Sequence, residues 1–269
     1  MAEPKFDYKD DKRIEAAMPL RPELIYEVIR REGDEELSRS FRSLILSAFA
    51  AGLAISMSVV AEAMIMRRLP EAGWSELIAD FGYCIGFVMV IIGRLQLFTE
   101  HTVTAVLPVA YKPTPGNLGR LLRLWAIVLG ANVVGAIVAA WFFVSSGALP
   151  PEGVEAVLTI GRHMTHDPFL IVLVKGVGAG FLIAALVWML PAAGAGKLAL
   201  IILITWLIAI AGFAHVVAGT VEIAALVIAG AEGVGKVVIE FWIPALIGNM
   251  LGGAALFALL AHGQVRDDM

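Results

Sequence analysis

The 269-residue sequence has little charge and a single cysteine. Only 16% of its residues are charged, whereas 59% are apolar, and the mean hydropathy is +0.83. Because Cys84 lies alone in an apolar run, an internal disulfide and a cysteine metal cluster are excluded. A net charge of −4 without a basic stripe excludes nucleic-acid binding as a primary role. This composition is typical of a membrane protein rather than of a soluble domain.

The charge that is present gathers at the start of the chain, where residues 1–42 hold nine Lys/Arg and eleven Asp/Glu. Apolar and charged residues alternate over 21–42, which predicts an amphipathic helix lying on the membrane face. We therefore expect three parts: a cytoplasmic N-terminal segment at 1–42, a transmembrane channel domain at 43–262 and a cytoplasmic tail at 263–269.

Six apolar stretches follow the N-terminal segment, and each is long enough to cross a hydrocarbon core of about 30 Å. They lie at 43–66, 77–111, 124–146, 168–190, 198–230 and 241–262. The second and fifth are too long for plain spans. Polar or small residues interrupt them, Thr99-Glu100-His101 in one and Gly212 to Thr220 in the other. This pattern predicts that both are broken helices, whose irregular backbone must be satisfied by protein or by a watery cavity.

Three spans per half, with the break in each middle span, indicate an inverted repeat. The third spans of the halves agree, since Leu129-Gly-Ala-Asn132-Val-Val-Gly135 is similar to Ile247-Gly-Asn249-Met-Leu-Gly252. The predicted fold is thus an all-α membrane protein with six transmembrane helices in a 3+3 inverted repeat. Its site is expected near the midplane, where the broken helices face each other. With the N-terminus inside, inner segments hold 14 Lys/Arg and outer loops 4, which predicts that both termini are cytoplasmic.

Ionisable residues inside the predicted spans are functional candidates, because burying a charge in a bilayer is costly. The candidates are Arg94, Glu100, His101, Lys175, His215 and Glu222. His215 is the first choice for a pore role, because it lies at a break and an imidazole can donate to an anion. For Glu100 and His101, pore lining and capping of a half-helix both stay open. Lys175 either pairs with Glu222 or attracts anions in an outer vestibule, and Arg94 is a candidate partner of Glu100.

Several short motifs resemble those of the formate/nitrite transporter family. Leu97-Phe98-Thr99 is similar to that family's Leu-Phe-Thr element in the broken second helix, and Gly212-Phe-Ala-His215 to its Gly-Phe-Glu-His element in the fifth. The segments around Asn132 and Asn249 resemble its third and sixth helices, and the resemblance covers about residues 35–262. It implies an aquaporin-like six-span protomer in a homopentamer, each protomer with a pore for small monovalent anions such as formate, nitrite or hydrosulfide.

The resemblance also implies roles for individual residues. His215 would sit between two apolar constrictions and hydrogen-bond or protonate the passing anion. Leu97 and Phe98 would form part of one constriction, with the hydroxyl of Thr99 reaching the pore. Asn249 would hydrogen-bond near the central site, while Tyr83 and Phe87 would line the other approach.

The chain departs from the family pattern at several positions. Ala214 stands where the family has Glu, Gly180 stands where it has Asn, and Lys175, Glu222 and Glu100-His101 are additions. These departures indicate a divergent, YfdC-like branch.

The predicted function is a channel or transporter for a small weak-acid anion, with a proton link through His215 as a further hypothesis. The alternative is a pore for water or a small neutral solute. An intramembrane enzyme is disfavoured, because no nucleophile–base spacing or metal set is present. We expect no cofactor and no metal. The expected partners are the lipid bilayer, the transported solute and further copies of the chain, in the inner membrane of a bacterium.

Overall fold

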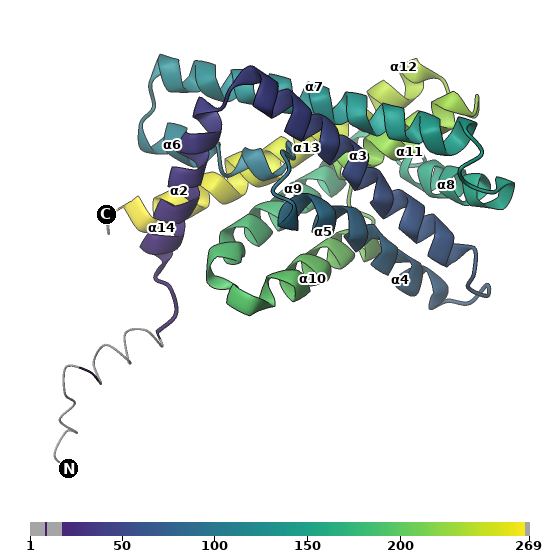
Figure 1. Cartoon of the computed structure of the whole chain (residues 1–269), viewed down its shortest axis with the longest axis horizontal. Helices are drawn as coiled ribbons and strands as arrows, with labels where there is room; N and C mark the ends of the chain where they lie inside the picture. Colours follow the sequence, from purple (N-terminus) through teal and green to yellow (C-terminus); the bar gives the residue numbers. More distant parts are fainter. Residues whose placement is uncertain (1–8, 10–17, 267–269) are drawn as a thin grey trace, which may run out of the picture.

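The secondary structure is all helical in the computed structural model, which describes residues 9 and 18–266 (Figure 1). The N-terminal half contains α2 (Pro22–Ser38), α3 (Phe41–Met66), α4 (Ser75–Ala79), η1 (Asp80–Tyr83), α5 (Cys84–Ile92), η2 (Glu100–Thr102), α6 (Val106–Tyr111) and α7 (Pro115–Ser145). The remainder contains α8 (Pro151–Met164), α9 (Phe169–Met189), η3 (Leu190–Ala192), η4 (Gly194–Gly196), α10 (Lys197–Ile210), α11 (Val216–Ile228), α12 (Val234–Val237), η5 (Val238–Trp242), α13 (Ile243–Met250), η6 (Leu251–Ala258) and α14 (Leu259–Val265).

Five helical runs in the described part of the chain are long and apolar enough to cross a membrane. They are Phe41–Met66, Ser75–Ile92, Pro115–Ser145, Phe169–Ala192 and Val234–Val265. The fifth stretch, predicted to be a broken helix, contains two shorter apolar helices, Gly194–Ile210 and Val216–Ile228. The third span begins at Pro115 rather than at residue 124, because Pro at the first helical position and the Thr114 side chain, which accepts a hydrogen bond from Asn117 N, start the helix earlier.

Both predicted interruptions are present, although their limits differ from those expected. α5 ends at Ile92, and the chain is non-helical from Gly93 until η2 begins at Glu100. α10 ends at Ile210, and helix resumes at Val216, so residues 216–220 are helical rather than part of the break. Arg94 and Gly212 have positive φ angles of 51° and 60°, which turn the chain out of each preceding helix.

α8 was not expected from the sequence. It is too short to span a bilayer, and its polar residues interrupt the apolar pattern. It buries one face, which includes Val157 and Ile160, and it packs against α11 and α3.

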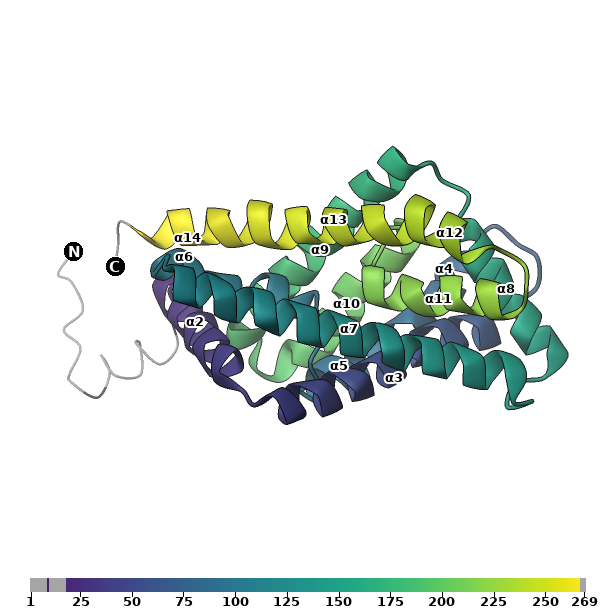
Figure 2. The same ribbon diagram turned by 90° about the horizontal axis from the view of Figure 1, so that it is seen from above.

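Small residues lie where the long helices pack closely against each other. α3 packs along α7, and α9 packs along α13; α3, α7 and α13 run along the length of the molecule in Figure 2. A Cβ atom built on Gly52 would lie 3.0 Å from Gly135 Cα, and one built on Gly176 would lie 3.1 Å from Gly248 Cα. Larger side chains at these positions would push the helices apart.

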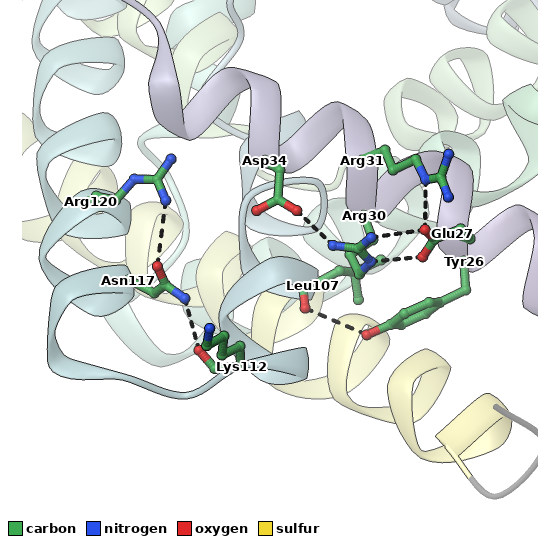
Figure 3. Close-up of polar contacts among 9 residues, drawn as sticks. All are labelled: Tyr26, Glu27, Arg30, Arg31, Asp34, Leu107, Lys112, Asn117 and Arg120. Carbon is green, nitrogen blue, oxygen red and sulfur yellow. Dashed lines mark hydrogen bonds and ion pairs between the residues drawn. The ribbon is translucent and has the colours of Figure 1, made fainter.

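The predicted amphipathic helix is present as α2, which packs against α6 and α14 (Figure 1). Its buried Tyr26 hydroxyl lies 2.7 Å from Nδ1 of His262 in α14 and 3.5 Å from the Leu107 carbonyl in α6. Arg30 forms ion pairs with Glu27 and Asp34 on the same helix (Figure 3). Hydrogen bonds from Arg30 lower the pKa of Glu27 to about 2, and burial raises the pKa of Tyr26 to about 12.

The predicted division into 1–42, 43–262 and 263–269 stays a prediction. Residues 1–8, 10–17 and 267–269 of its terminal parts lie outside the described residues.

Candidate functional site

The first break lies deep in the protein. Gln96, Leu97, Phe98 and Thr99 are all buried, with exposures between 0% and 4%. Their backbone groups are not in a helix, so other partners must satisfy them.

Asn132 of α7 supplies those partners. Its Oδ1 accepts a hydrogen bond from Phe98 N at 2.9 Å, and its Nδ2 donates to Gln96 O at 2.8 Å and to Ala48 O of α3 at 2.7 Å. The single side chain therefore links α7, the first break and α3.

Asn249 of α13 makes the same three contacts in the other half of the chain. Its Oδ1 accepts from Val216 N at 2.8 Å, and its Nδ2 donates to Ala214 O at 2.8 Å and to Gly176 O of α9 at 2.9 Å. The sequence analysis assigned Asn249 to the central site. In the structure its amide is fully buried and bonded to backbone groups, so it shapes the break.

A tryptophan in each half of the chain adds a further pair of matching contacts. Neither tryptophan was among the predicted site residues. Trp125 and Trp242 each lie seven residues before the asparagine of their half. Trp125 Nε1 donates to His101 O at 3.1 Å, and Trp242 Nε1 donates to the Thr220 hydroxyl at 3.1 Å. Each indole thus holds the segment that follows the break, and the shared Trp–Asn spacing was the signal that would have revealed them.

Packing explains why glycine stands at position 180, where the family pattern has asparagine. A Cβ atom there would overlap the backbone of Asn249, with Cα at 2.7 Å. Gly52 has the matching place in α3, where a Cβ would overlap the Asn132 backbone. Only glycine allows each asparagine helix to approach its neighbour this closely.

His215 joins the two breaks. It precedes α11, and its Nδ1 accepts a hydrogen bond from Ala218 N at 3.2 Å. Its Nε2 lies 2.7 Å from Oγ1 of Thr99, which comes from the first break. Because a backbone N–H can only donate, Nδ1 must be the acceptor, and the proton of the neutral ring is therefore on Nε2. The imidazole donates to the Thr99 oxygen, which leaves the threonine hydroxyl hydrogen available for another acceptor.

Aromatic rings of α5 and of the preceding η1 lie next to His215 and to each other. Phe87 packs edge-on against the imidazole with ring centroids 5.0 Å apart, and Tyr83 lies one turn further at 5.2 Å from Phe87. Phe98 is buried and packs edge-on against Trp125 at 5.9 Å, next to the fully buried Leu97. Of the four predicted constriction residues, Phe87 thus contacts the imidazole, and Leu97 and Phe98 directly precede Thr99 in the chain. Their role in a constriction stays a prediction.

The expected pairing of Lys175 with Glu222 is wrong. Lys175 Nζ instead lies 2.5 Å from Asp167 Oδ2, in the turn before α9. A Cβ atom on Gly212 would be 3.7 Å from this ammonium group, so Lys175 lies beside the second break. Asp167 was missed because it precedes the predicted apolar span and shows no helical spacing with Lys175.

The expected pairing of Arg94 with Glu100 is also wrong, because Arg94 turns outward at the end of α5. Its side chain is 79% exposed and lies 3.7 Å from Glu32 of α2. Glu100 has a buried Oε1 without a hydrogen-bond partner among the described residues. His101 is bonded to Gln96 at 2.8 Å and to Thr104 at 3.1 Å.

A cavity of about 890 Å³ opens beside this group. Its wall includes Glu100 and His101 together with residues of α2 and the start of α10. Carboxylates and cations both line it: Glu32, Glu35, Glu36, Glu100, Arg39, Arg94 and Lys197.

Glu222 is 2% exposed, and its Oε2 has no hydrogen-bond partner among the described residues. Glu62 belongs to α3, which packs against α11 and against η1, the element that contains Asp80. The sequence analysis overlooked Glu62 and Asp80, although both fall inside predicted spans. Within the described ranges, no group of three or more His, Cys, Asp or Glu is placed to hold a metal ion.

Comparison with known proteins places these features in a family. A family model described as "Formate/nitrite transporter" matches residues 23–263. The chain is 43% identical over 255 residues to "Inner membrane protein YfdC" of Escherichia coli, covering 95% of this chain and 82% of that protein. It is 26% identical to "Formate channel BtFdhC" of Bacillus thuringiensis, covering 87% of this chain and 91% of the relative.

A solved structure described as "Pentameric formate channel with formate bound" has the same fold, with a TM-score of 0.69 at 20% identity, over 84% of this chain and 97% of that one. The relatives are named as membrane proteins and channels, which agrees with a role other than that of an enzyme.

Proposed function

The chain belongs to the formate/nitrite transporter family, whose members move anions through membranes, and we propose that it conducts small monovalent weak-acid anions of the formate, nitrite and hydrosulfide class past His215. The observation that carries the proposal is the buried hydrogen bond between His215 and Thr99. It joins two helix breaks at one point, the kind of place where irregular backbone serves a transported solute.

We also propose that six spans form a 3+3 inverted repeat, with the broken helices as the second and fifth spans. The support is the matched set of contacts. Asn132 and Asn249 each bond the break of their own half and the first helix of that half, to Ala48 and Gly176 respectively. If the two three-span halves face each other at their helix breaks, His215 of one break and Thr99 of the other meet near the midplane.

The assembly and orientation belong to the same proposal. A homopentamer follows from the fold shared with a solved channel described as pentameric. Inner segments rich in Lys/Arg favour cytoplasmic termini, and the similarity to an Escherichia coli inner membrane protein favours a bacterial inner membrane.

The chemistry at the centre follows from the tautomer of His215. The ring holds the Thr99 oxygen with its Nε2 proton, so the Thr99 hydroxyl hydrogen is directed to a further acceptor. A passing anion would be that acceptor, and a hydrogen bond to a charged group contributes about 1.5–3 kcal/mol. Phe87 and Tyr83 exclude water nearby, which strengthens this interaction.

A proton is proposed to accompany the anion. Moving an isolated carboxylate into apolar surroundings costs far more than one hydrogen bond returns, whereas its neutral acid crosses at much lower cost. Flux should therefore rise as the pH falls toward the pKa of the substrate acid.

Proteoliposome flux of formate, nitrite and hydrosulfide at two pH values tests the proposal. We expect His215→Ala and Thr99→Val each to lower flux at least roughly tenfold, equivalent to about 1.4 kcal/mol. Thr99→Ser keeps the hydroxyl and is the matched control, which should retain most of the flux. If His215→Ala and Thr99→Val both conduct anions as fast as the wild type, His215 and Thr99 have no part in the mechanism.

A pore for water or a neutral solute is the second candidate. Its support is the ion pair between Lys175 and Asp167, which neutralises the ammonium group that lies beside the second break. Stopped-flow swelling of the same proteoliposomes with uncharged solutes separates the two. Swelling without anion flux would favour the neutral pore.

A further inference from the structure

The ammonium group of Lys175 lies beside the second break, on the helix that packs against it. A Cβ atom built on Gly212, three residues before His215, would lie 3.7 Å from Lys175 Nζ. One turn further along α9, a Cβ atom built on Gly178 would lie 2.8 Å from the ring of Phe213. The break therefore contacts the part of α9 that carries Lys175, and the charge of Lys175 acts on it at close range.

The two halves of the chain differ at this position. Ser47 in α3 and Lys175 in α9 each directly precede the residue whose carbonyl bonds to the asparagine of its half. Ser47 Oγ accepts a hydrogen bond from Gln96 N of the first break at 3.2 Å. The first break thus has a neutral hydroxyl where the second has an ammonium group. A break can be built without a charge here, so the ammonium group requires another explanation.

Asp167 offsets the charge of Lys175. Nζ of Lys175 lies 2.5 Å from Oδ2 of Asp167, and this is the one ion pair of Lys175 among the described residues. Asp167 directly precedes Pro168, the N-cap residue of α9, so its backbone is held at the end of a helix. The Lys175 and Asp167 side chains are 35% and 26% exposed, so a dissolved ion can reach both of them.

An anion that approaches Lys175 meets a charge that is already balanced. Its attraction to the ammonium group and its repulsion from the carboxylate nearly cancel at distances much longer than the 2.5 Å between the two groups. To bind the ammonium group closely, the anion must share it with Asp167 or displace the carboxylate. A neutral solute is not subject to this competition. The carboxylate therefore disfavours anions relative to neutral molecules.

We propose that Asp167 is a specificity-determining residue, which lowers the affinity of the second break for small anions by holding Lys175 in an ion pair. This inference rests on the proposed function and extends it to a residue that lies outside the predicted spans. Asp167 acts through Lys175, and the strength of their ion pair sets how far anions are favoured over neutral solutes.

The dependence of flux on formate concentration in proteoliposomes, at low ionic strength, tests the proposal. Asp167→Asn keeps the shape of the side chain and removes its charge. We expect the formate concentration that gives half-maximal flux to fall roughly two- to fivefold, the range typical of a partly exposed ion pair, with little change in maximal flux. Glu155→Gln removes a carboxylate from an ion pair with Arg162 on α8 and is the matched control, which should leave that concentration unchanged.

A double variant separates an effect through Lys175 from a general change of structure. In Lys175→Met the ammonium group is absent, so adding Asp167→Asn should not change the half-maximal concentration further. Asp167→Ser should act like Asp167→Asn, so one misfolded variant still leaves the other to decide. Three results would overturn the proposal: no change in the two Asp167 variants, an equal decrease in the Lys175→Met background, or an equal decrease in Glu155→Gln.

Protection of Lys175 from chemical modification measures anion binding without transport. The full-length protein in detergent is treated briefly with an amine-acetylating reagent, and modification of Lys175 is quantified by mass spectrometry at increasing formate concentrations. Half-maximal protection should need a roughly two- to fivefold lower formate concentration in Asp167→Asn than in the wild type. Equal concentrations contradict the role of Asp167. If protection differs as expected but the wild type carries no anion across the membrane, the proposed function fails and the effect of Asp167 on anion binding stands.

Discussion

At the scale of single residues, the two asparagines are as important as the histidine. Each makes three hydrogen bonds to backbone groups that a broken helix leaves without partners, at distances of 2.7–2.9 Å. An amide is suited to this task because it carries one acceptor and two donors on one rigid plane. His215 keeps its place through this support, since Asn249 bonds the carbonyl of Ala214 and the amide of Val216 on either side of it.

Removing that amide should destabilise the protein more than it alters selectivity. Asn249→Ala leaves three buried backbone groups without partners, and we expect a loss of ~3 kcal/mol or more in stability. Asn132→Ala should cost a similar amount because its contacts match. Thermal denaturation in detergent measures both, with Asn117→Ala near the start of α7 as the control. Wild-type melting of Asn249→Ala would contradict the supporting role.

Part of the residue-level site could be predicted from the sequence. His215 and Thr99 stand next to the interruptions in the apolar pattern, and the structure brings them within 2.7 Å of each other. The partner of Lys175 could not be predicted, because Asp167 lies in a turn whose path only packing determines. Glu62 is present in the first predicted span but was overlooked.

At the scale of secondary-structure elements, α2 illustrates how charge and packing combine. Its apolar face buries Ile25 and Ile29, and its polar face carries the Arg30 ion pairs (Figure 3). The alternation of apolar and charged residues predicted this helix. It did not predict the contacts with α6 and α14, because those helices are distant in sequence and the Tyr26–His262 contact spans almost the whole chain.

The pKa of Glu27 predicts a pH dependence for α2. The folded value of about 2 lies below the ordinary 4.5, so the contribution is complete above about pH 4.5 and is lost as the pH falls toward 2. Since the Glu27–Arg30 ion pair is partly exposed, it contributes at most about 1 kcal/mol to the stability of the folded protein. Hydrogen exchange of α2 in the wild type and in Glu27→Gln measures it. The wild type should be better protected at about pH 6, and the two should converge only as the pH falls to about 2; a difference that grows in acid would reverse the sign.

At the scale of the whole molecule, the chain is an all-helical membrane protein of the formate/nitrite transporter family. Its long helices are mostly apolar on the outside as well as within, with exposed Leu203, Val174 and Leu260 among many others. Such a surface is stable in lipid and not in water. In the described part of the chain, two shorter apolar helices, Gly194–Ile210 and Val216–Ile228, accompany the five helical runs that are long enough to span a membrane.

Cysteine labelling tests the proposed orientation. In a Cys84→Ser background, which contains no other cysteine, we expect Ala148→Cys in the α7–α8 connection to react with an impermeant thiol reagent added to intact cells. Ala195→Cys, in the connection before α10, should react only after the membrane is opened. Both positions are exposed, so burial does not account for a difference. The opposite pattern would place the termini outside.

Composition and periodicity determined the membrane class, the helical content and the position of both interruptions, because these depend on the local balance of apolar and polar residues. Short motifs determined the family. The tertiary structure decided which interrupted segments meet, which partners Lys175 and Arg94 take, and that Glu222 lies buried. Those outcomes depend on close approach between helices far apart in the chain, which glycine contacts and asparagine hydrogen bonds permit and which no local pattern records.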